Sequence, residues 1–400
     1  MSLANKFSGS RVFLAVSLAI GPAPGLLAAS GPESGNTDTD IADLTPGDLA
    51  WEQWGNAAWL HMADSETLWI RAALATHLAT RKDPGLSAIG HERFEAIAPV
   101  PTTDPLTLWH LGRYCSAFRQ SSTCEEQQII ERLGQADPSN LAALLVVDQH
   151  RSGEQWTTLD TQSPTNQNLL KSMAAAERYD EYWGRGSSEL LDALEEYSQQ
   201  NPPPAITELL SATGYDPSLI FLFPIPSMEG FSPGYSKLFK LCETLAEAGE
   251  PSAIRDCLTI AHTLQYNSKT TLAGNMGITL ELNVQSAIDP DSAATLLAAR
   301  KRAITRHSGT CAIPKLMQGG HKVDLESETL AALSSAWLRE VDTLGEVQAM
   351  QRAAEREYAL YPDEFSSNPA DCPDVRAMSN MEMVEYLGSD DPARQQDGLR

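Results

Sequence analysis

The segment YSKLFKLCETLAEAGEPSAIRDCLTIAHTL, residues 235–264, predicts two amphipathic helices joined by a short turn. Apolar side chains recur every three or four positions on both sides of the turn, which is the spacing of one face of an α-helix. Gly249 is typical of a helix end, and Ser252 is a suitable N-cap for the helix that follows. We therefore expect a helical hairpin whose two apolar faces meet.

Two cysteines lie on these facing stripes and predict a disulfide. Cys242 lies six residues before Ala248, and Cys257 lies five residues after Ser252. At about 1.5 Å of rise per residue, the two positions are nearly level across the hairpin. The alternative is a pair of free cysteines in the core, because unpaired cysteine also favours buried apolar faces.

The other four cysteines give two further predicted pairs. Cys115 and Cys124 flank a similar turn at residues 119–123, so we expect them to pair. Cys311 then pairs with Cys372 by elimination. The spacings lack the close Cys-x-x-Cys pairs of structural zinc sites, and we predict no metal ligand, cofactor-binding residue or catalytic thiol among them.

Helical spacing continues along most of the chain, and convincing alternating strands are missing from the sequence. For example, Leu190, Leu191, Leu194 and Tyr197 fall on one helix face. We predict an all-α protein of stacked helical hairpins with disulfides, arranged as an α-solenoid-like array or as an irregular helical bundle. The expected segments are a signal peptide (1–30), a disordered leader (31–45), an N-terminal helical region (46–213), a proline- and aromatic-rich connector (214–236), a C-terminal helical region (237–388) and a disordered tail (389–400).

The N-terminus predicts export. Lys6 and Arg11 precede a short apolar run at residues 12–20, and small residues follow up to an expected cleavage site near Ser30. This order is typical of a secretory signal peptide. The even number of cysteines fits an oxidising compartment, so we expect a periplasmic or secreted protein with no membrane anchor. The formal charge of −24 disfavours nucleic acid and anionic lipid as partners.

A short motif recurs ahead of several predicted helices: an aspartate, often followed by proline, before an apolar run. The four copies place the aspartate at Asp64, Asp104, Asp137 and Asp289. Aspartate is a good N-cap and proline is favoured at the first helical position, so we expect each aspartate to cap a helix. The first three copies are 40 and 33 residues apart, close to the length of a helical-hairpin repeat.

Residues 64–151, and more loosely residues 235–300, resemble the tetratricopeptide-type helical repeats. Besides the Asp-Pro turns, the resemblance rests on residue types found in that family's first helix, namely Trp109, Leu111, Gly112 and Tyr114. The tryptophan and the tyrosine are each one position away from the family's spacing. The resemblance implies stacked helix pairs with a concave surface that binds protein, and it implies no particular partner.

Aromatic residues mark two candidate binding surfaces. Trp51 and Trp54 lie on one face of the first predicted helix, and Phe221, Phe223 and Phe231 lie in the proline-rich connector. Dense aromatic groups are typical of interaction hot spots. The alternative is that the tryptophans anchor the first helix over the core and that the connector is packed filler.

Three motifs resemble known chemical sites but differ from them in decisive details. The segment GFSPG at residues 230–234 matches the Gly-x-Ser-x-Gly pattern of hydrolases, but Pro233 has no N–H to serve an oxyanion hole beside Ser232. The segment HERFE at residues 91–95 lacks the second histidine of a zinc-protease helix, and GGHK at residues 319–322 lacks the spacing of a phosphate loop. We therefore predict no catalytic residue from a local motif.

The leading hypothesis is an exported, non-catalytic binding or scaffold protein whose partner is a protein or peptide. A cell-envelope enzyme with an active site assembled from distant helices is the first alternative, and a deep groove lined by paired carboxylates would favour it. A secreted inhibitor or immunity-type protein is the second, and salt-sensitive binding of a basic partner would favour that hypothesis.

Overall fold

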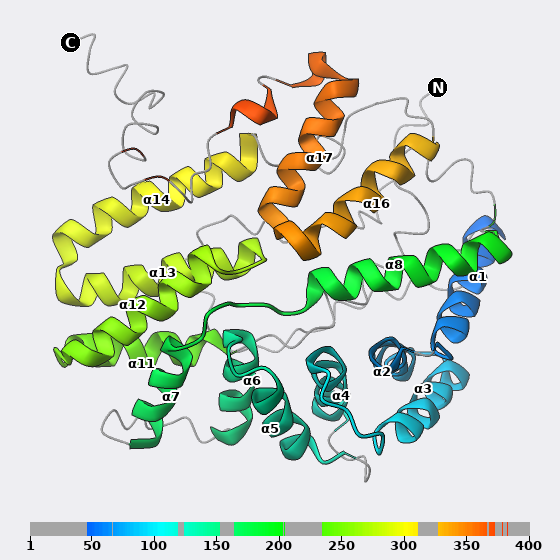
Figure 1. Cartoon of the computed structure of the whole chain (residues 1–400), viewed down its shortest axis with the longest axis horizontal. Helices are drawn as coiled ribbons and strands as arrows, with labels where there is room; N and C mark the ends of the chain where they lie inside the picture. Colours follow the sequence, from blue (N-terminus) through cyan, green and yellow to red (C-terminus); the bar gives the residue numbers. More distant parts are fainter. Residues whose placement is uncertain are drawn as a thin grey trace, which may run out of the picture. The chain divides into compact units, whose positions relative to one another are not determined.

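The fold is described from a computed structural model, shown in Figure 1. The structure describes residues 46–65, 67–118, 124–152, 164–202, 204, 234–310, 327–365, 368–372, 378 and 382. Within these residues the chain forms fourteen α-helices and two short 3-10 helices, and it forms no β-strand beyond two isolated bridges. The prediction of an all-α fold is confirmed.

Helices that follow each other in the chain usually pack together. The N-terminal helices are α1 (Pro46–Met62), α2 (Leu68–Ala79), α3 (Pro84–Ile97), α4 (Pro105–Ala117), α5 (Glu126–Ala136), α6 (Leu141–Ser152), α7 (Pro164–Ala174) and α8 (Trp183–Gln200). The C-terminal elements are α11 (Tyr235–Glu247), α12 (Pro251–Tyr266), α13 (Thr271–Ile288), α14 (Pro290–Thr310), α16 (Ser327–Leu344), α17 (Glu346–Leu360), η3 (Pro362–Glu364) and η4 (Pro369–Asp371). Helix α2 contacts α3 and α4, α4 contacts α5, and α12 contacts both α11 and α13. The predicted stacked hairpins are present.

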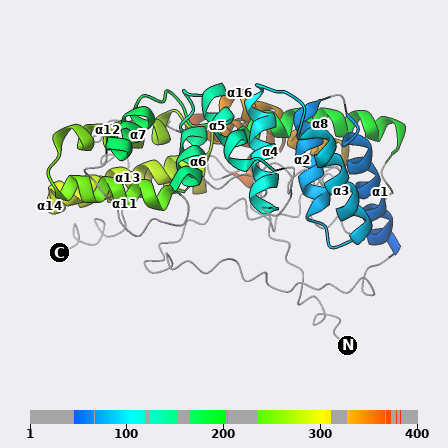
Figure 2. The same cartoon turned by 90° about the horizontal axis from the view of Figure 1, so that it is seen from below.

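Helix α2 is buried on almost all sides. Ten of its twelve residues are buried, including Trp69. A helix that is apolar all round needs neighbours on several faces, and α1, α3 and α4 supply them. Figure 2 shows α1, α2 and α3 side by side. Gly90 allows α3 to come close, because a Cβ there would lie 2.2 Å from the backbone N of Ala79.

Both predicted hairpin disulfides are confirmed. Cys242 in α11 is bonded to Cys257 in α12 with a Cα–Cα distance of 5.8 Å. Cys115 in α4 is bonded to Cys124, just before α5, with a Cα–Cα distance of 5.3 Å. Cys311 lies outside the described residues, so its pairing with Cys372 stays a prediction.

The turn of the α11–α12 hairpin differs from the prediction by two residues. Gly249 ends α11 in the left-handed conformation, with φ of +68°, as its position suggested. The expected N-cap at Ser252 is wrong, because α12 begins at Pro251 and Glu250 occupies the N-cap position. The fixed φ of proline suits the first helical position, where its missing N–H has no partner to lose.

Two of the four aspartates of the recurring motif cap helices as predicted. Oδ2 of Asp104 accepts a hydrogen bond from N of Thr107 at 2.9 Å, at the start of α4. Oδ1 of Asp289 accepts one from N of Asp291 at 3.3 Å, at the start of α14. In both cases proline follows the aspartate at the first helical position.

The prediction is wrong for the other two aspartates. The N-cap of α2 is Thr67, while Asp64 forms an ion pair with Arg93. Asp137 follows the end of α5, and Asn140 caps α6 by accepting a backbone N–H at 3.1 Å. In both cases the cap lies three residues beyond the aspartate. The motif therefore does not mark one constant helix start.

Two helices connect parts of the chain that are far apart in the sequence. Helix α7 packs on α12, and α8 packs on both α1 and α16. Gly184 brings α8 against the backbone of α16, since a Cβ there would lie 2.7 Å from Cα of Asp342. The described parts of both predicted helical regions accordingly belong to one compact unit.

Several predicted segments fall outside the described residues. These are the signal peptide and leader (1–45), most of the connector (214–233) and the tail (389–400). The last two residues of the predicted connector belong to α11, which begins at Tyr235. None of the described helices combines the length and the hydrophobicity that a membrane span requires.

Candidate functional site

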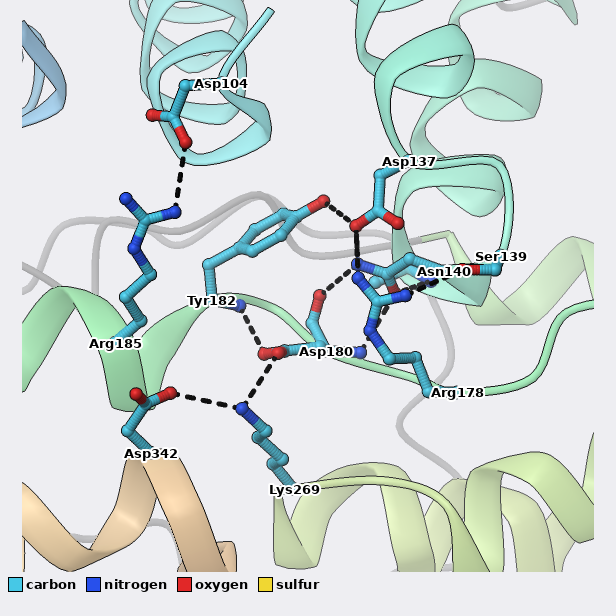
Figure 3. A network of polar contacts seen from close by, with 11 residues as sticks. Asp104, Asp137, Ser139, Asn140, Arg178, Asp180, Tyr182, Arg185, Lys269 and Asp342 are labelled. Carbon is cyan, nitrogen blue, oxygen red and sulfur yellow. Dashed lines mark hydrogen bonds and ion pairs between the residues drawn. The ribbon is translucent and has the colours of Figure 1, made fainter.

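Polar side chains from distant parts of the chain meet around the segment 177–182, which links α7 to α8. We call this cluster the polar junction. Figure 3 shows seven of its members: Asp137, Asn140, Arg178, Asp180, Tyr182, Lys269 and Asp342. The other four members are Tyr179, Glu181, Tyr235 and Glu346. They come from the α5–α6 turn, the 177–182 segment, the start of α11, the α12–α13 turn, the end of α16 and the start of α17.

The backbone of the 177–182 segment is hydrogen-bonded to other parts of the chain on both sides. On one side, N of Leu141 donates to O of Arg178 at 2.8 Å. On the other side, N of Tyr179 donates to O of Asn267 at 3.0 Å. Two isolated parallel bridges, one to Asn140 and one to Ser268, describe the same pairing. The segment therefore joins the α5–α6 turn to the α12–α13 turn.

Asp137 is the centre of the first half of the junction. The residue is 5% exposed, and its Oδ2 accepts hydrogen bonds from Tyr182 Oη at 2.6 Å, Arg178 Nη2 at 2.6 Å and Asn140 Nδ2 at 3.1 Å. A buried carboxylate is costly without partners, and three donors satisfy this one. Burial, and then the neighbouring Asp137, raise the pKa of the Tyr182 hydroxyl far above its ordinary value, so Tyr182 stays a donor.

Asp180 and Lys269 form the second half. Lys269 Nζ lies 3.2 Å from Asp180 Oδ2 and 3.1 Å from Asp342 Oδ1, so one ammonium links two carboxylates (Figure 3). Burial alone would lower the pKa of Lys269, but the two carboxylates outweigh burial and hold that pKa above its usual value. This contact connects the segment to the end of α16.

Tyr182 has an unusual backbone conformation for a residue with a side chain. Its φ is +58°, the only positive φ outside glycine among the described residues. Such a conformation costs about 1 kcal/mol or more and persists where surrounding bonds fix it. Here N of Tyr182 donates to Asp180 Oδ1 at 2.7 Å, and its hydroxyl is held by Asp137. The left-handed residue turns the extended segment into α8.

A second polar contact fixes the first turn of α8 to α4. Arg185 Nη1 donates to Asp104 Oδ1 at 3.0 Å (Figure 3). Arg185 Nε donates to Glu189 Oε1 at 2.8 Å. Trp69 Nε1 in turn donates to Glu189. The carboxylate that caps α4 therefore also holds α8 in place.

Tyr179, Glu181 and Tyr235 form a chain of hydrogen bonds beside these ion pairs. The Tyr179 hydroxyl donates to Glu181 Oε1 and also contacts the hydroxyl of Tyr235, the first residue of α11. Burial raises the pKa of the Glu181 carboxyl to about 7, and the negative charges of Glu346 and Asp180 act in the same direction. With this pKa, the Glu181 carboxyl can gain or lose a proton near neutral pH.

The structure places one of the predicted binding residues in the core. Trp54 is 8% exposed, its Nε1 donates to O of Asn201 at 2.8 Å, and its ring centroid lies 5.8 Å from that of Tyr197. The expectation of a surface role for Trp54 is therefore wrong, and the alternative of an anchor between α1 and α8 describes its position. A tryptophan buries a large apolar area, and α8 supplies the surface that covers it.

The remaining predicted surface residues are not described. The side chain of Trp51 and all of Phe221, Phe223 and Phe231 lie outside the described part of the chain, as do Ser232 and the GGHK segment. His91 contacts the hydroxyl of Tyr114, so it has a partner within the fold. Among the described residues, no cluster of three histidine, cysteine or carboxylate side chains could hold a metal ion.

Sequence reasoning missed the polar junction. A visible signal existed in the segment RYDEYW, residues 178–183, which places two adjacent carboxylates between aromatic residues outside any helical stripe. The partners of these carboxylates could not be found in the same way, because Lys269 and Asp342 are about 90 and 160 positions further along the chain.

Comparison with known proteins gives no relative for this chain. No protein-family model matches it, and neither the curated proteins nor the solved structures include a significant match. The structure alone therefore defines the class: an all-α protein of stacked helical hairpins with disulfides. Disulfides of this kind indicate an oxidising environment.

Proposed function

We propose that this chain is an exported, non-catalytic helical protein that binds a protein or peptide and acts as a scaffold. The N-terminal sequence pattern supports export to the periplasm or beyond, and the disulfides fit such a compartment. Stacked helix pairs like those that residues 64–151 resemble present extended surfaces to partners.

The observation that carries the binding role is the exposure of large apolar side chains at the end of α13 and in the first half of α14. Helix α14 packs on α13, and Ala293, Leu297 and Ala303 on α14 are buried. Ile288, the last residue of α13, is 53% exposed, and Leu296 on α14 is 41% exposed. Leu296 lies about 9 Å along α14 from its start. Large apolar side chains exposed to water on neighbouring helices are what a protein partner would cover.

Affinity capture tests this proposal. The mature chain is immobilised and exposed to an envelope extract of its own source, beside an Ile288→Ser/Leu296→Ser variant. Both replaced side chains are exposed, so folding is expected to be unchanged. We expect the wild type to recover a reproducible protein or peptide and the variant to recover at least tenfold less, in keeping with the loss of roughly 1.4 kcal/mol or more.

A matched control separates this surface from general stickiness. Val100, between α3 and α4, is also an exposed apolar residue, at 36%. Val100→Ser should recover the same partner as the wild type. Failure of the wild type to capture any partner, or equal capture by all three proteins, would contradict the binding role of this surface.

One observation favours the enzyme alternative. The pKa of the Glu181 carboxyl is about 7, and a general acid is most efficient when its pKa lies near the pH at which the enzyme works. Its partners Tyr179 and Tyr235 belong to the packing of the junction, which favours a structural role. Turnover of a glycan or peptide by the mature chain that disappears in Glu181→Gln would replace the binding proposal. A basic partner that is lost at high salt would instead favour the inhibitor hypothesis.

A further inference from the structure

Residues 292–323 have a charge pattern opposite to that of the whole chain. The chain contains 53 aspartates and glutamates against 29 lysines and arginines. Residues 292–323 contain no aspartate or glutamate, but they contain six of the basic residues: Arg300, Lys301, Arg302, Arg306, Lys315 and Lys322. The first four of these lie on α14, so positive charge is concentrated on one helix of an acidic protein.

Helix α14 is anchored to the rest of the fold on one side. Among the described helices, its extensive contacts are with α13 (Figure 1). Arg300 belongs to this contact. It is 8% exposed, its Nη1 lies 3.2 Å from Glu281 Oε2 on α13, and its guanidinium carbon lies 4.7 Å from the ring centroid of Tyr266. The side of α14 that carries Arg300 therefore faces α13.

Lys301 and Arg302 lie away from this contact, and both are exposed. Because successive residues of an α-helix are turned by about 100°, the two side chains are rotated by about 100° and 200° from Arg300. Neither forms an ion pair with a carboxylate in the described part of the chain, whereas Arg339 and Arg356 do. We call these two adjacent cations the basic face of α14.

The usual stabilising roles of helical cations do not account for the basic face. The helix dipole favours positive charge within the last turn, but Lys301 and Arg302 precede the last residue of α14, Thr310, by nine and eight positions. Ion pairs within a helix join residues three or four positions apart, and no carboxylate occupies those positions around either cation. The charge therefore adds little to the stability of α14 itself.

We infer that the basic face, Lys301 and Arg302, is a docking surface for an acidic segment of a partner protein. Carboxylates of such a segment would complement two cations that the fold leaves without ion-pair partners. This inference rests on the proposed binding role and adds the chemistry of the partner. It uses a side of α14 other than that of Leu296, which lies four positions before Arg300 and hence near the side that faces α13.

A short acidic segment fits this surface better than a membrane or a nucleic acid does. Asp289 and Asp291 lie at the start of α14, about 15 Å or more along the helix from Lys301. An extended anionic surface would also approach these carboxylates and others of a chain whose formal charge is −24. A short segment bound at the basic face can avoid them, because charges more than about 8 Å apart are largely screened at physiological ionic strength.

Fluorescence anisotropy with a labelled poly-glutamate peptide tests the inference on the mature chain. We expect the wild type to bind this peptide and not to bind a labelled Gly-Ser peptide of equal length. The affinity should fall at least about tenfold as ionic strength rises from about 0.1 M to about 1 M, because the Debye length shortens from about 10 Å to about 3 Å. A wild type that does not bind poly-glutamate would overturn the inference.

Charge reversal assigns the binding to the basic face. Lys301→Glu/Arg302→Glu should weaken poly-glutamate binding at least about tenfold, since attraction becomes repulsion at two positions. The control, Arg255→Glu/Arg352→Glu, makes the same change in net charge at exposed positions on α12 and α17 and should bind as the wild type does. Equal weakening in the two variants would mean that net charge sets the affinity, and would overturn the inference. If the reversed variant does not fold, Lys301→Gln/Arg302→Gln decides, and unchanged binding in it is the contradicting result.

Two further arms separate this inference from the proposed binding surface and from other polyanions. Ile288→Ser/Leu296→Ser should bind poly-glutamate as the wild type does, because the basic face is intact. If that variant loses its captured partner while the wild type ignores poly-glutamate, only the present inference fails. If poly-glutamate binds and no partner is captured, only the Ile288–Leu296 surface fails. Binding of phosphatidylglycerol vesicles or DNA in place of poly-glutamate would overturn the assignment to an acidic protein segment.

Discussion

The helical hairpins and the polar junction hold this protein together by different physical means. In the α11–α12 hairpin, two apolar stripes face each other, and a disulfide joins Cys242 and Cys257, which are 15 residues apart in the sequence. In the junction, Asp137, Asp180, Lys269 and Asp342 come from four separate parts of the chain and meet through directional bonds. Apolar contact is non-directional and tolerates many arrangements, whereas buried polar groups need particular partners. The hairpins thus build the elements, and the junction decides which elements meet.

The two regions also respond to pH with opposite sign. In α4, burial, aided by the positive charge of Arg113, lowers the pKa of His110 to about 3. In the junction, burial raises the pKa of Glu181 to about 7. The contribution of His110 to stability is lost as pH falls below 6.5, while that of Glu181 is lost as pH rises above 4.5. Between these values the two effects oppose each other.

The largest expected effect is that of Asp137→Ala. The change leaves the buried Tyr182 hydroxyl without its acceptor, removes the carboxylate that pairs with Arg178 and takes one of two acceptors from Asn140 Nδ2, so we expect the free energy of unfolding to fall by about 3 to 4 kcal/mol. Urea denaturation measures the loss. The matched apolar change is Leu133→Ala in α5, at a residue that is 0% exposed and should cost about 2 to 5 kcal/mol.

Hydrogen exchange distinguishes the two losses by their location. Asp137→Ala should lower the protection of the distant Tyr179 amide, because the segment loses its anchor. Leu133→Ala should mainly loosen α5 and its neighbours. Equal loosening at Tyr179 in both variants would mean that the junction has no special part in joining the helical regions.

Removal of the hairpin disulfide comes next. Replacing Cys242 and Cys257 together by alanine opens a loop of about 15 residues, and we expect the free energy of unfolding to fall by about 3 kcal/mol. Chemical denaturation of the double variant, beside wild type kept oxidised, provides the measurement. Because the disulfide lies within one hairpin, the hydrogen-exchange protection of the Tyr179 amide should fall only as much as the free energy of global unfolding does. A larger fall at Tyr179 would mean that the hairpin disulfide also stabilises the polar junction.

Gly184→Ala tests the close contact between α8 and α16. The added Cβ would lie 2.7 Å from Cα of Asp342, so the backbones must separate, at a cost of about 1 to 3 kcal/mol. Thermal unfolding followed by circular dichroism gives the size of the effect. Ser188→Ala, at a partly buried position one turn further along α8, is the matched control and should change stability little.

His110→Phe tests the opposing pH responses. The replacement removes a buried imidazole that must stay neutral, so only the Glu181 response should remain between pH 4.5 and 6.5. Relative to wild type, stability should increase as pH falls, by about 1 kcal/mol per pH unit. Urea titrations at several pH values measure this slope. Parallel pH profiles of the two proteins would show that His110 is not protonated on unfolding in this range.

The smallest effect concerns the recurring aspartates. Asp104→Ala removes the cap of α4 and the partner of Arg185, and should cost about 1 to 2 kcal/mol. Asp64→Ala removes an exposed ion pair with Arg93 and should cost less than about 1 kcal/mol. Paired denaturation curves compare them. If Asp64→Ala lowered the free energy of unfolding more than Asp104→Ala, the recurring aspartate would stabilise helix starts more generally than the structure indicates.

The sequence by itself determined the elements and their local links. Periodic apolar residues predicted the all-α fold and the hairpins, and the positions of Cys242 and Cys257 on facing stripes predicted their disulfide, because these features depend on residues close in the chain. The caps were predicted correctly at Asp104 and Asp289. The cap was missed at Asp137, which proline also follows directly, because Asn140 three residues further on caps α6.

Only the tertiary structure decided how the hairpins are joined and where the polar groups end up. Asp137 was expected at a helix start and instead lies buried among Tyr182, Arg178 and Asn140. Trp54 was a candidate binding residue with core anchoring as the alternative, and the structure packs it against Tyr197 of α8. Both outcomes depend on partners more than 40 positions away, and neither helical periodicity nor capping preference carries information about contacts at that separation.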